Sequence, residues 1–596
     1  MTRGAAVAYP CTMPPITTPP RPSHPIPDAH GANLYARDAE LQALLPLYLP
    51  ADLCAHLQAP LQRLGELAGG VLDTLALTAD KHPPTLSHRS RSGVDAQRIT
   101  KHPAYLALER VAFSEYGLAA MSHRAGVLGW AAPMPPAAKY ALSYLFVQAE
   151  FGLCCPLSMT DSLTRTLRKF GATELVDRYL PQLTTQVFDD LWQGAMFMTE
   201  QGAGSDVAAT ATLAEPDGEA WALTGDKWFC SNPDAGLAMV LARIAGSPPG
   251  LRGVSLFLLP RTLDDGSANR YRIVRLKDKL GSRSMASGEI RLEGAQAWLV
   301  GEPGQGFKQM ADMINNSRLS NGMRAAGLMR RAYGEALHVA CERRAFGQRL
   351  IDLPLMRRQL IKLLLPTEQA RTMLFQTADA LRRADAGDTE AYALARILTP
   401  LIKFRACRDA RKVTGDAMEV RGGCGYIEEW SDPRLLRDAH LGSIWEGTSN
   451  IVALDVMRAA RREAALPALA GHLQRLLAAT PLHPAAREVF DQVRNRALAL
   501  AAQVADAEGS ADASARAAAS GLYHVTTAIA MAWEAGQTGS ARRLRLAQCV
   551  VKHRVLPQDP LAFSGGDDNA NDPALAALLE PQAGDPGEPL DAINLF

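Results

Sequence analysis

One carboxylate stands out in the segment SIWEGTSN (443–450), where Glu446 lies between the bulky Trp445 and the small Gly447. Apolar residues such as Ile444 surround it in the sequence. A carboxylate in apolar surroundings loses hydration and holds its proton more tightly, which suits a general base working near neutral pH. A glutamate favoured by the positive end of a following helix explains the residue equally well. On its own sequence context, Glu446 therefore remains open to both interpretations.

The segment MTEQGAGSDV begins at Met198, at the end of an expected strand. Gly202, Gly204 and Ser205 would let the backbone approach a flat ligand closely and would offer N–H groups and a hydroxyl as donors. The glycines alone fit a polar β-turn equally well.

An aromatic pair ends the strand-like segment GDKWFCSN (225–232). Trp228 or Phe229 could cover a ring system while Ser231 donates a hydrogen bond. Aromatic residues in strands are more often part of a core, so this segment taken alone favours packing.

Two further segments could contact a ligand. Arg343 and Phe346 follow a long helical pattern in CERRAFGQRL, and a guanidinium has the fork geometry that grips a pyrophosphate. Gly422 and Gly423 in VRGGCGY allow close backbone contact. In isolation, a solvated helix end is the more common explanation of Arg343.

Several common catalytic and cofactor signatures are absent from the sequence. There is no GxGxxG between a strand and a helix, no Walker A loop, no GxSxG, no HExxH and no paired-cysteine zinc spacing. A nucleotide cofactor must therefore be held in another way, and no metal site is expected.

These residues need a scaffold, and 596 residues are too many for one core. Helical spacing of apolar residues, short β-rich pieces between turn residues, and helical spacing again follow one another along the chain. We therefore expect an α+β multidomain protein whose middle domain is a β-barrel or sandwich. The expected parts are a Pro-rich extended arm (1–32), an N-terminal helical domain (33–193), the β-domain (194–300), a C-terminal helical domain (301–463), an extra Arg-rich helical domain (464–556) and an acidic disordered tail (557–596).

The composition indicates a cellular compartment but does not indicate a binding partner. Hydrophobic residues make up 47% and charged residues 21%, as in ordinary globular proteins, and the net charge is +1. The 9 cysteines are scattered without CxxC pairs, which favours a reducing, cytoplasmic compartment. No apolar run is long enough to cross a bilayer, so no membrane association is expected.

The order of the motifs on a helix–β–helix layout resembles the acyl-CoA dehydrogenase superfamily, from about Leu34 to Glu463. Segments such as RLKDKLGSRSMASGE, FGQRLIDLPLMR and SIWEGTSNIVALDVMR resemble its AidB-like branch of adaptive-response proteins, which are induced by DNA alkylation. The resemblance implies the acyl-CoA dehydrogenase fold with an extra C-terminal helical domain.

The resemblance implies a flavoprotein whose FAD lies between the β-domain and the C-terminal bundle, with a neighbouring subunit of a homotetramer completing the site. Phe229 and Ser231 replace the usual Trp and Thr, and Glu419 replaces a commoner Gln. The implied cofactor-binding residues are Met198, Thr199, Gly204, Ser205, Phe229, Ser231, Arg343, Phe346, Glu419, Gly422, Gly423, Thr448 and Asn450.

The resemblance also assigns the chemistry. Glu446 would remove the α-proton of an acyl-CoA thioester while the flavin accepts a hydride from the β-carbon, and an electron-transferring flavoprotein would reoxidise the flavin. Some members carry the base on an earlier helix, where this chain has Asn315 to Ser317 and no acid. Arg318 matches an arginine near the substrate.

The Arg-rich extension raises the possibility of binding double-stranded DNA, which the resemblance associates with this branch. Between Met457 and Leu556 there are thirteen basic and seven acidic residues, an excess of six positive charges. Ordinary solvated helix faces would explain the arginines as well, and the acidic tail could fold back on them. The candidate DNA-binding residues are Arg458, Arg542, Arg543, Arg545, Lys552 and Arg554.

Three functions therefore remain open from the sequence. The first is an oxidoreductase of the alkylation-response type that also binds DNA. The second is a metabolic dehydrogenase for short or branched acyl-CoA without DNA binding. The third is a DNA-binding protein in which FAD is structural and catalysis vestigial.

Overall fold

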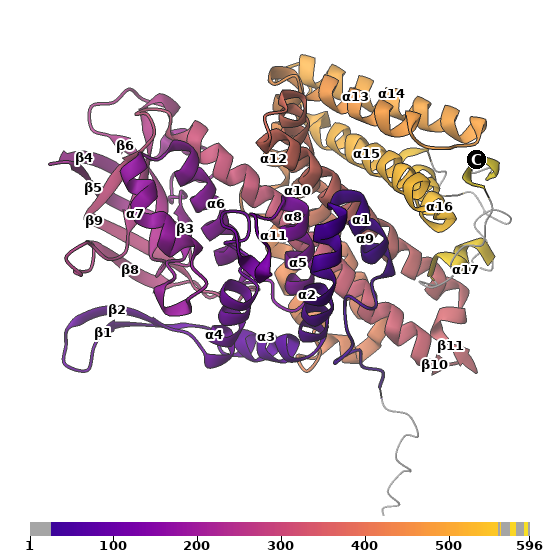
Figure 1. Cartoon of the computed structure of the whole chain (residues 1–596), viewed down its shortest axis with the longest axis horizontal. Coiled ribbons are helices and arrows are strands. Elements are labelled where there is room, and N and C mark those ends of the chain that lie inside the picture. Colours follow the sequence, from indigo (N-terminus) through magenta and orange to yellow (C-terminus); the bar gives the residue numbers. More distant parts are fainter. Residues whose placement is uncertain (1–25, 558–560, 562–572, 580–588, 594–596) are drawn as a thin grey trace, which may run out of the picture.

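The computed structural model describes residues 26–557, 561, 573–579 and 589–593, and it confirms the expected fold class. A helical part, a β-domain and a helical bundle follow one another, with further helices packed on the bundle (Figure 1). No helix in these ranges is long and apolar enough to cross a membrane.

The N-terminal part is helical, as expected, but it also contains a hairpin that the sequence did not predict. Strands β1 (Thr85–Arg89) and β2 (Asp95–Thr100) pair antiparallel and project beside α4 (Figure 1). Most of their side chains are exposed, so the hydrophobic alternation that marks a strand is missing. The helices are α1 (Ala39–Tyr48), α2 (Ala51–Gly69), α3 (Val71–Lys81), α4 (Pro103–Glu109), α5 (Pro136–Val147), α6 (Cys154–Phe170) and α7 (Thr173–Thr184).

The middle domain is a closed barrel. Strand β6 pairs with β4 at one edge and β7 at the other, while β5 and β9 join β4 to β7. Strands β3 and β8 extend this circuit by pairing with β6 and β9. The strands are β3 (Gly194–Phe197), β4 (Leu213–Asp217), β5 (Ala220–Ser231), β6 (Leu237–Ile244), β7 (Val254–Pro260), β8 (Tyr271–Leu276) and β9 (Ser287–Val300).

Strand β6 shows why both faces of this barrel wall are apolar. Ala238, Val240 and Ala242 point into the barrel core, whereas the alternate residues Leu237 and Met239 join the large helical core. This shared packing fixes the barrel against the helices, and with it the ends of β3 and β5 that carry candidate site residues.

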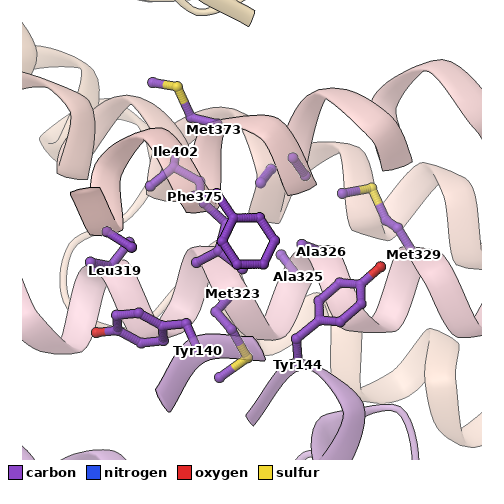
Figure 2. Packing of buried hydrophobic residues seen from close by; sticks show 14 of the residues in the cluster. Tyr140, Tyr144, Leu319, Met323, Ala325, Ala326, Met329, Met373, Phe375 and Ile402 are labelled. Atoms are coloured by element: carbon purple, nitrogen blue, oxygen red, sulfur yellow. The ribbon is translucent and has the colours of Figure 1, made fainter. Parts of the chain in front are cut away.

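Three long helices form the centre of the molecule: α8 (Gly306–Glu342), α9 (Pro354–Asp385) and α10 (Thr389–Arg421). Figure 2 shows Tyr140 of α5 packed with Met323 of α8, Phe375 of α9 and Ile402 of α10. Because one face of α8 is locked into this core, its polar residues at the candidate site are held in fixed positions.

The C-terminal extension is built into the bundle. Its helices are α13 (Ala465–Ala478), α14 (Pro484–Asp506), α15 (Ala515–Thr538) and α16 (Ala541–Val550), while α11 (Asp432–Gly442) and α12 (Ser449–Arg462) precede them in the bundle. Helix α15 is mostly buried against α9, α10 and α12. It therefore shares one core with the dehydrogenase-like part.

The tail differs in part from the disordered segment that we expected. Helix α17 (Pro573–Leu579) packs against α9 and α16, and its Leu578 and Leu579 are buried. The Arg542 guanidinium donates to the Leu578 carbonyl oxygen, so the tail does fold back on α16. Most of the acidic residues of the tail, and residues 1–25 of the expected arm, lie outside the described ranges.

A buried carboxyl at the contact between barrel and bundle gives a pH prediction. Asp438 of α11 accepts the Ser282 N–H at 2.6 Å, and burial raises the pKa of this carboxyl to about 7. Because the folded pKa lies above the unfolded value, its stabilising contribution is present in acid and is lost as pH rises through about 7.

We expect Asp438→Asn to remove this loss, since the amide oxygen can still accept the Ser282 N–H. The urea midpoint of the wild type should fall between pH 5 and pH 8, whereas that of the variant should stay nearly constant. The variant should therefore be more stable than the wild type at pH 8. Asp217→Asn on the exposed end of β4 serves as the matched control. A lower midpoint for Asp438→Asn at both pH values would refute the prediction.

Candidate active site

Glu446 lies in the turn between α11 and α12, held by two side chains of α8. The Ser317 hydroxyl donates to Glu446 Oε1 at 2.5 Å, and Asn321 Nδ2 donates to Oε2. The apolar surroundings expected from the sequence are therefore wrong for the carboxylate itself, whose direct partners are polar. Glu446 has φ of 53° and Gly447 has φ of 98°, so the turn that presents the carboxylate uses a backbone conformation rare for a side-chain-bearing residue.

Cationic side chains fix the backbone of this turn. Arg318 Nε donates to the Glu446 carbonyl oxygen at 3.2 Å, and Lys403 Nζ donates to the Gly447 carbonyl oxygen at 2.6 Å. Burial lowers the pKa of the Lys403 ammonium to about 8. Arg318 Nη1 also bonds Asp455 at 2.6 Å, so the predicted substrate residue lies beside Glu446 and is anchored to α12.

The predicted flavin residues of the barrel gather at one end of it. Thr199 follows β3, and its carbonyl oxygen accepts the Trp228 N–H of β5 at 2.8 Å. Phe229 is 58% exposed, a large fraction for an aromatic ring in a strand. Burial in a core does not therefore explain Phe229, whose ring lies at the surface with Lys277 Nζ 4.7 Å from its centre. Gly204 and Ser205 are exposed in the loop between Met198 and β4.

Glu200 anchors that loop. Its carboxylate accepts from Lys227 Nζ at 2.7 Å, from the Ala211 N–H at 2.7 Å and from the Thr212 hydroxyl at 2.5 Å. Both ends of the glycine-rich segment are therefore fixed, while an added Cβ at Gly202 or Gly204 would meet no atom within 4 Å. The loop presents backbone to open space, as a ligand-binding loop must.

The surroundings of a buried thiol include both a barrel residue and Glu446. Burial raises the pKa of the Cys155 thiol at the start of α6, and the Glu446 carboxylate and the Ser231 side chain both act on it as well. Ser231 of β5 and Glu446 are thus neighbours of one residue. The structure brings them together from positions more than two hundred residues apart.

Five further predicted cofactor residues form a second, separate group: Arg343, Phe346, Glu419, Gly422 and Gly423. Arg343 ends α8 and donates to the Arg421 carbonyl oxygen at 3.1 Å, and an added Cβ at Gly422 would lie 3.8 Å from its Nη1. Phe346 is 92% exposed at the tip of the hairpin formed by β10 (Arg344–Ala345) and β11 (Gln348–Arg349). Glu419 and Gly423 are exposed nearby in sequence.

The two groups lie at opposite ends of the molecule. Figure 1 shows β3 and β5 at the left and the β10–β11 hairpin at the lower right. Ser317 and Arg343 are 26 residues apart along α8 and the residue that follows it, which corresponds to about 39 Å. One bound dinucleotide cannot contact both groups within a single chain.

Comparison with known proteins now identifies the family. Family models match residues 25–190 (adaptive response protein AidB N-terminal domain), 195–295 (acyl-CoA dehydrogenase, middle domain) and 304–461 (acyl-CoA dehydrogenase, C-terminal domain). The putative acyl-CoA dehydrogenase AidB of Escherichia coli is 35% identical over 74% of this chain and 80% of its own length. The chain belongs to the acyl-CoA dehydrogenase family.

Two solved structures support the same conclusion over a longer stretch. Caenorhabditis elegans ACDH-11 in complex with C11-CoA has a TM-score of 0.83 at 27% identity and covers 93% of this chain and 96% of its own. The apo-form of Bd2924 has a TM-score of 0.78 at 31% identity, over 85% of this chain and 99% of its own. A match over 93% of the chain must include most of the helices after residue 461.

As a member of this family the chain is a FAD-dependent oxidoreductase, and its residues fit the cofactor. An exposed Phe229 ring, the Thr199 and Ser231 hydroxyls and an open glycine loop suit a flat, polar ring system. Arg343 beside Gly422 suits a pyrophosphate. When bound, FAD supplies the acceptor for a hydride.

Two predicted cofactor residues, Thr448 and Asn450, lie directly after the Glu446 turn. Thr448 is the N-cap residue of α12, and both side chains are exposed. Since neither helps to hold the Glu446 carboxylate within the chain, both remain available to a cofactor.

Sequence reasoning missed three residues of this site: Asn321, Arg324 and Lys403. Asn321 lies four residues after Ser317 on α8, and Arg324 lies three residues after Asn321. This spacing places Ser317, Asn321 and Arg324 on one face of the helix. That spacing was a usable signal, because polar residues recur where the rest of the helix has an apolar stripe. Lys403 gave no such signal, since its contact with Gly447 depends on the packing of α10.

The predicted DNA contacts need correction. Arg543 is buried and paired with Glu40, Glu368 and Glu534 at 2.8, 3.0 and 2.6 Å, so it cannot reach a phosphate. Arg542 is half-buried and bonded to Glu40 and α17. Arg545, Lys552 and Arg554 are half-buried, and Arg458 is exposed but lies 3.6 Å from Asp455. In the densest arginine cluster of the sequence, Arg542 and Arg543 therefore form ion pairs within the fold.

Proposed function

We propose that this protein oxidises the acyl group of a CoA thioester between its α- and β-carbons, with Glu446 as the general base. The observation that carries the proposal is the fixed placement of the Glu446 carboxylate, which Ser317 and Asn321 of α8 hold in one orientation, near the Cys155 thiol on which Ser231 of β5 also acts. A positioned carboxylate facing a flavin site is the arrangement that α-proton removal coupled to hydride transfer requires.

In this mechanism each contact of the turn has a role. The α-proton moves to a carboxylate oxygen of Glu446, while Ser317 and Asn321 keep that group in one rotamer. Arg318 and Lys403 hold the turn through its carbonyl oxygens. These side chains keep the base in place before substrate arrives, which lowers the entropic part of the barrier.

The direct test is anaerobic titration of purified, yellow holoprotein with short, branched and longer acyl-CoA thioesters. Loss of flavin absorbance with one of these, and none with CoA alone, supports the proposal. If every thioester leaves the flavin oxidised, then the vestigial function with structural FAD replaces it. Reoxidation by an electron-transferring flavoprotein would identify the class of acceptor.

We infer that the working protein contains more than one chain, as a tetramer of the family type, and that it works in the cytoplasm. The support is that Arg343 of the second group lies about 39 Å along α8 from Ser317 at the Glu446 turn, so that a neighbouring copy would be needed to bring a second group to this site. A sedimentation measurement that found only monomer with bound FAD would contradict this inference.

DNA binding remains a second candidate function, on a different surface from that expected. Burial lowers the pKa of the Arg408 guanidinium, and the positive charges of three neighbours lower it further: Arg516, Arg405 and Arg411. Arg411 and Arg516 are exposed. Of these four arginines, Arg405 is the one that is hydrogen-bonded to Asp409. Among the described residues these arginines of α10 and α15 outnumber the carboxylates beside them, and such an excess of positive charge attracts phosphates.

We expect the triple variant Arg408→Ala, Arg411→Ala, Arg516→Ala to bind fluorescent duplex DNA more weakly than the wild type. The slope of log affinity against log salt should shrink by roughly 2 to 3, because each lost phosphate contact removes about 0.9. The matched control replaces Arg89, Arg91 and Arg98, which are exposed on and beside the β1–β2 hairpin. Equal weakening by both triples, or no binding by wild type at low salt, would reject this surface.

A further inference from the structure

Arg324 of α8 is a fully buried arginine without a carboxylate. Its exposed fraction is 0%, and neither Nη1 nor Nη2 has a hydrogen-bond partner among the described residues. Only Nε is bonded, to the Ser320 carbonyl oxygen one turn earlier at 3.3 Å. Four of the five donors of a guanidinium therefore point into the interior unpaired.

The other arginines buried to the same degree show how unusual this is. Each of them is bonded to carboxylates within the chain: Arg371 to Asp38 and Glu368, Arg421 to Glu335 and Asp432, Arg434 to Asp73, and Arg543 to Glu40, Glu368 and Glu534. Taking a cation out of water without a partner is costly, so the protein pairs its buried arginines wherever it has no other use for them.

The guanidinium lies at the active site. Its central carbon is 4.6 Å from the centre of the Trp445 ring and 5.7 Å from that of Phe151, and these two rings are stacked at 5.9 Å. Trp445 directly precedes Glu446. Arg324 and Glu446 also act on the same Cys155 thiol. The unpaired donors are thus held on an aromatic surface next to the general base.

A small cavity that Ser320 helps to line has a mixed lining, in which apolar side chains expose more surface than polar ones. Its lining includes the hydroxyl groups of Tyr140, Ser143, Ser158 and Ser320, and the Ser158 hydroxyl has no hydrogen-bond partner in the described part of the chain. The inference therefore rests on Arg324 itself, since unpaired guanidinium donors give poor surroundings for the end of a plain hydrocarbon chain and good ones for an oxygen-bearing group.

We propose that Arg324 binds a carboxylate at the far end of the acyl group, so that this site takes dicarboxylic acyl thioesters. The proposal rests on the dehydrogenase function proposed above. Arg324 follows Asn321 by three residues, a rise of about 4.5 Å along α8, so a chain of a few carbons spans from Glu446 to the guanidinium. The substrate carboxylate would supply the partner that every other fully buried arginine finds within the protein.

Equilibrium binding separates this proposal from turnover. Holoprotein carrying Glu446→Gln, which cannot take the α-proton, is titrated calorimetrically with glutaryl-CoA and with pentanoyl-CoA. These thioesters have the same number of acyl carbons and differ in a terminal carboxylate or methyl group. We expect glutaryl-CoA to bind about 10- to 100-fold more tightly, the range for a hydrogen-bonded charge pair out of water.

A second substitution assigns the preference to Arg324. Adding Arg324→Leu should abolish or reverse the preference, whereas Arg324→Lys should retain part of it. Flavin content and circular dichroism establish that each variant is folded, and the lysine variant still tests the proposal if the leucine variant is not. Equal binding of both thioesters to the Arg324-containing protein would overturn the carboxylate proposal alone. Binding of neither thioester would overturn it together with the proposed dehydrogenase function.

Discussion

Replacing Glu446 with glutamine is expected to slow flavin reduction by an acyl-CoA by about 10²- to 10⁴-fold, the usual contribution of a positioned general base. Glutamine keeps the size of the side chain and can still accept from Ser317 or Asn321 through its one carbonyl oxygen. It has no carboxylate to take the α-proton. The variant should therefore keep its FAD, its fold and its affinity for thioesters.

Rapid mixing of oxidised enzyme with thioester, followed at the flavin absorbance, measures this step directly. Glu429→Gln, an exposed position in the segment before α11, is the matched control and should reduce its flavin at the wild-type rate. Ser317→Ala and Asn321→Ala should slow reduction less than Glu446→Gln does, because they disturb the orientation of the base without removing it. Wild-type kinetics for Glu446→Gln would place the base elsewhere.

The sequence was sufficient for the order of the domains and for the residues that local motifs mark. Long stretches rich in apolar residues located α5, α8 and α10, and short apolar or β-branched runs between turn residues located β5 to β9. Strand β4, with exposed Glu215, Pro216 and Asp217 in its second half, has no such run and was missed. The hairpin of β1 and β2 was missed for the same reason.

The polar environment of Glu446 was not predictable from its neighbours in sequence. Ser317 and Asn321 are more than a hundred residues away and meet Glu446 only because α8 packs along the turn before α12. Arg543 illustrates the opposite error. Three arginines in five residues resemble a phosphate-binding surface, but their exposure depends on where Glu40, Glu368 and Glu534 fold. Counting charges along the sequence does not reveal which carboxylates pair with Arg543.

Arg543 therefore leads to a prediction about stability. Its guanidinium joins Glu40 of α1 to Glu368 of α9 and Glu534 of α15, and Glu534 also accepts the Tyr48 hydroxyl at 2.7 Å. Arg543→Ala would leave these carboxylates in the interior without their shared cation. Breaking a buried ion pair from one side costs about 3–5 kcal/mol, and we expect a loss of that size in the free energy of unfolding.

Urea unfolding of the FAD-loaded protein, followed by circular dichroism, measures this loss as a lower midpoint. Arg545→Ala on the same helix is half-buried and should cost about 0.5 kcal/mol or less. Equal midpoints for the two variants would show that the buried network contributes nothing to stability. They would also show that the extension is only loosely attached to the dehydrogenase core.

The same network predicts how the protein responds to acid. The guanidinium groups of Arg371 and Arg543 outweigh burial and hold the pKa of the Glu368 carboxyl at about 2. Because this folded pKa lies below the unfolded value, the stabilisation is complete above about pH 5 and is lost as pH falls toward 2. Without Arg543 the pKa of the Glu368 carboxyl rises toward its unfolded value. The variant therefore loses less stability than the wild type as the pH falls. The wild type and Arg543→Ala should therefore differ most near neutral pH and converge below about pH 3, whereas a defect in packing alone would keep the difference constant.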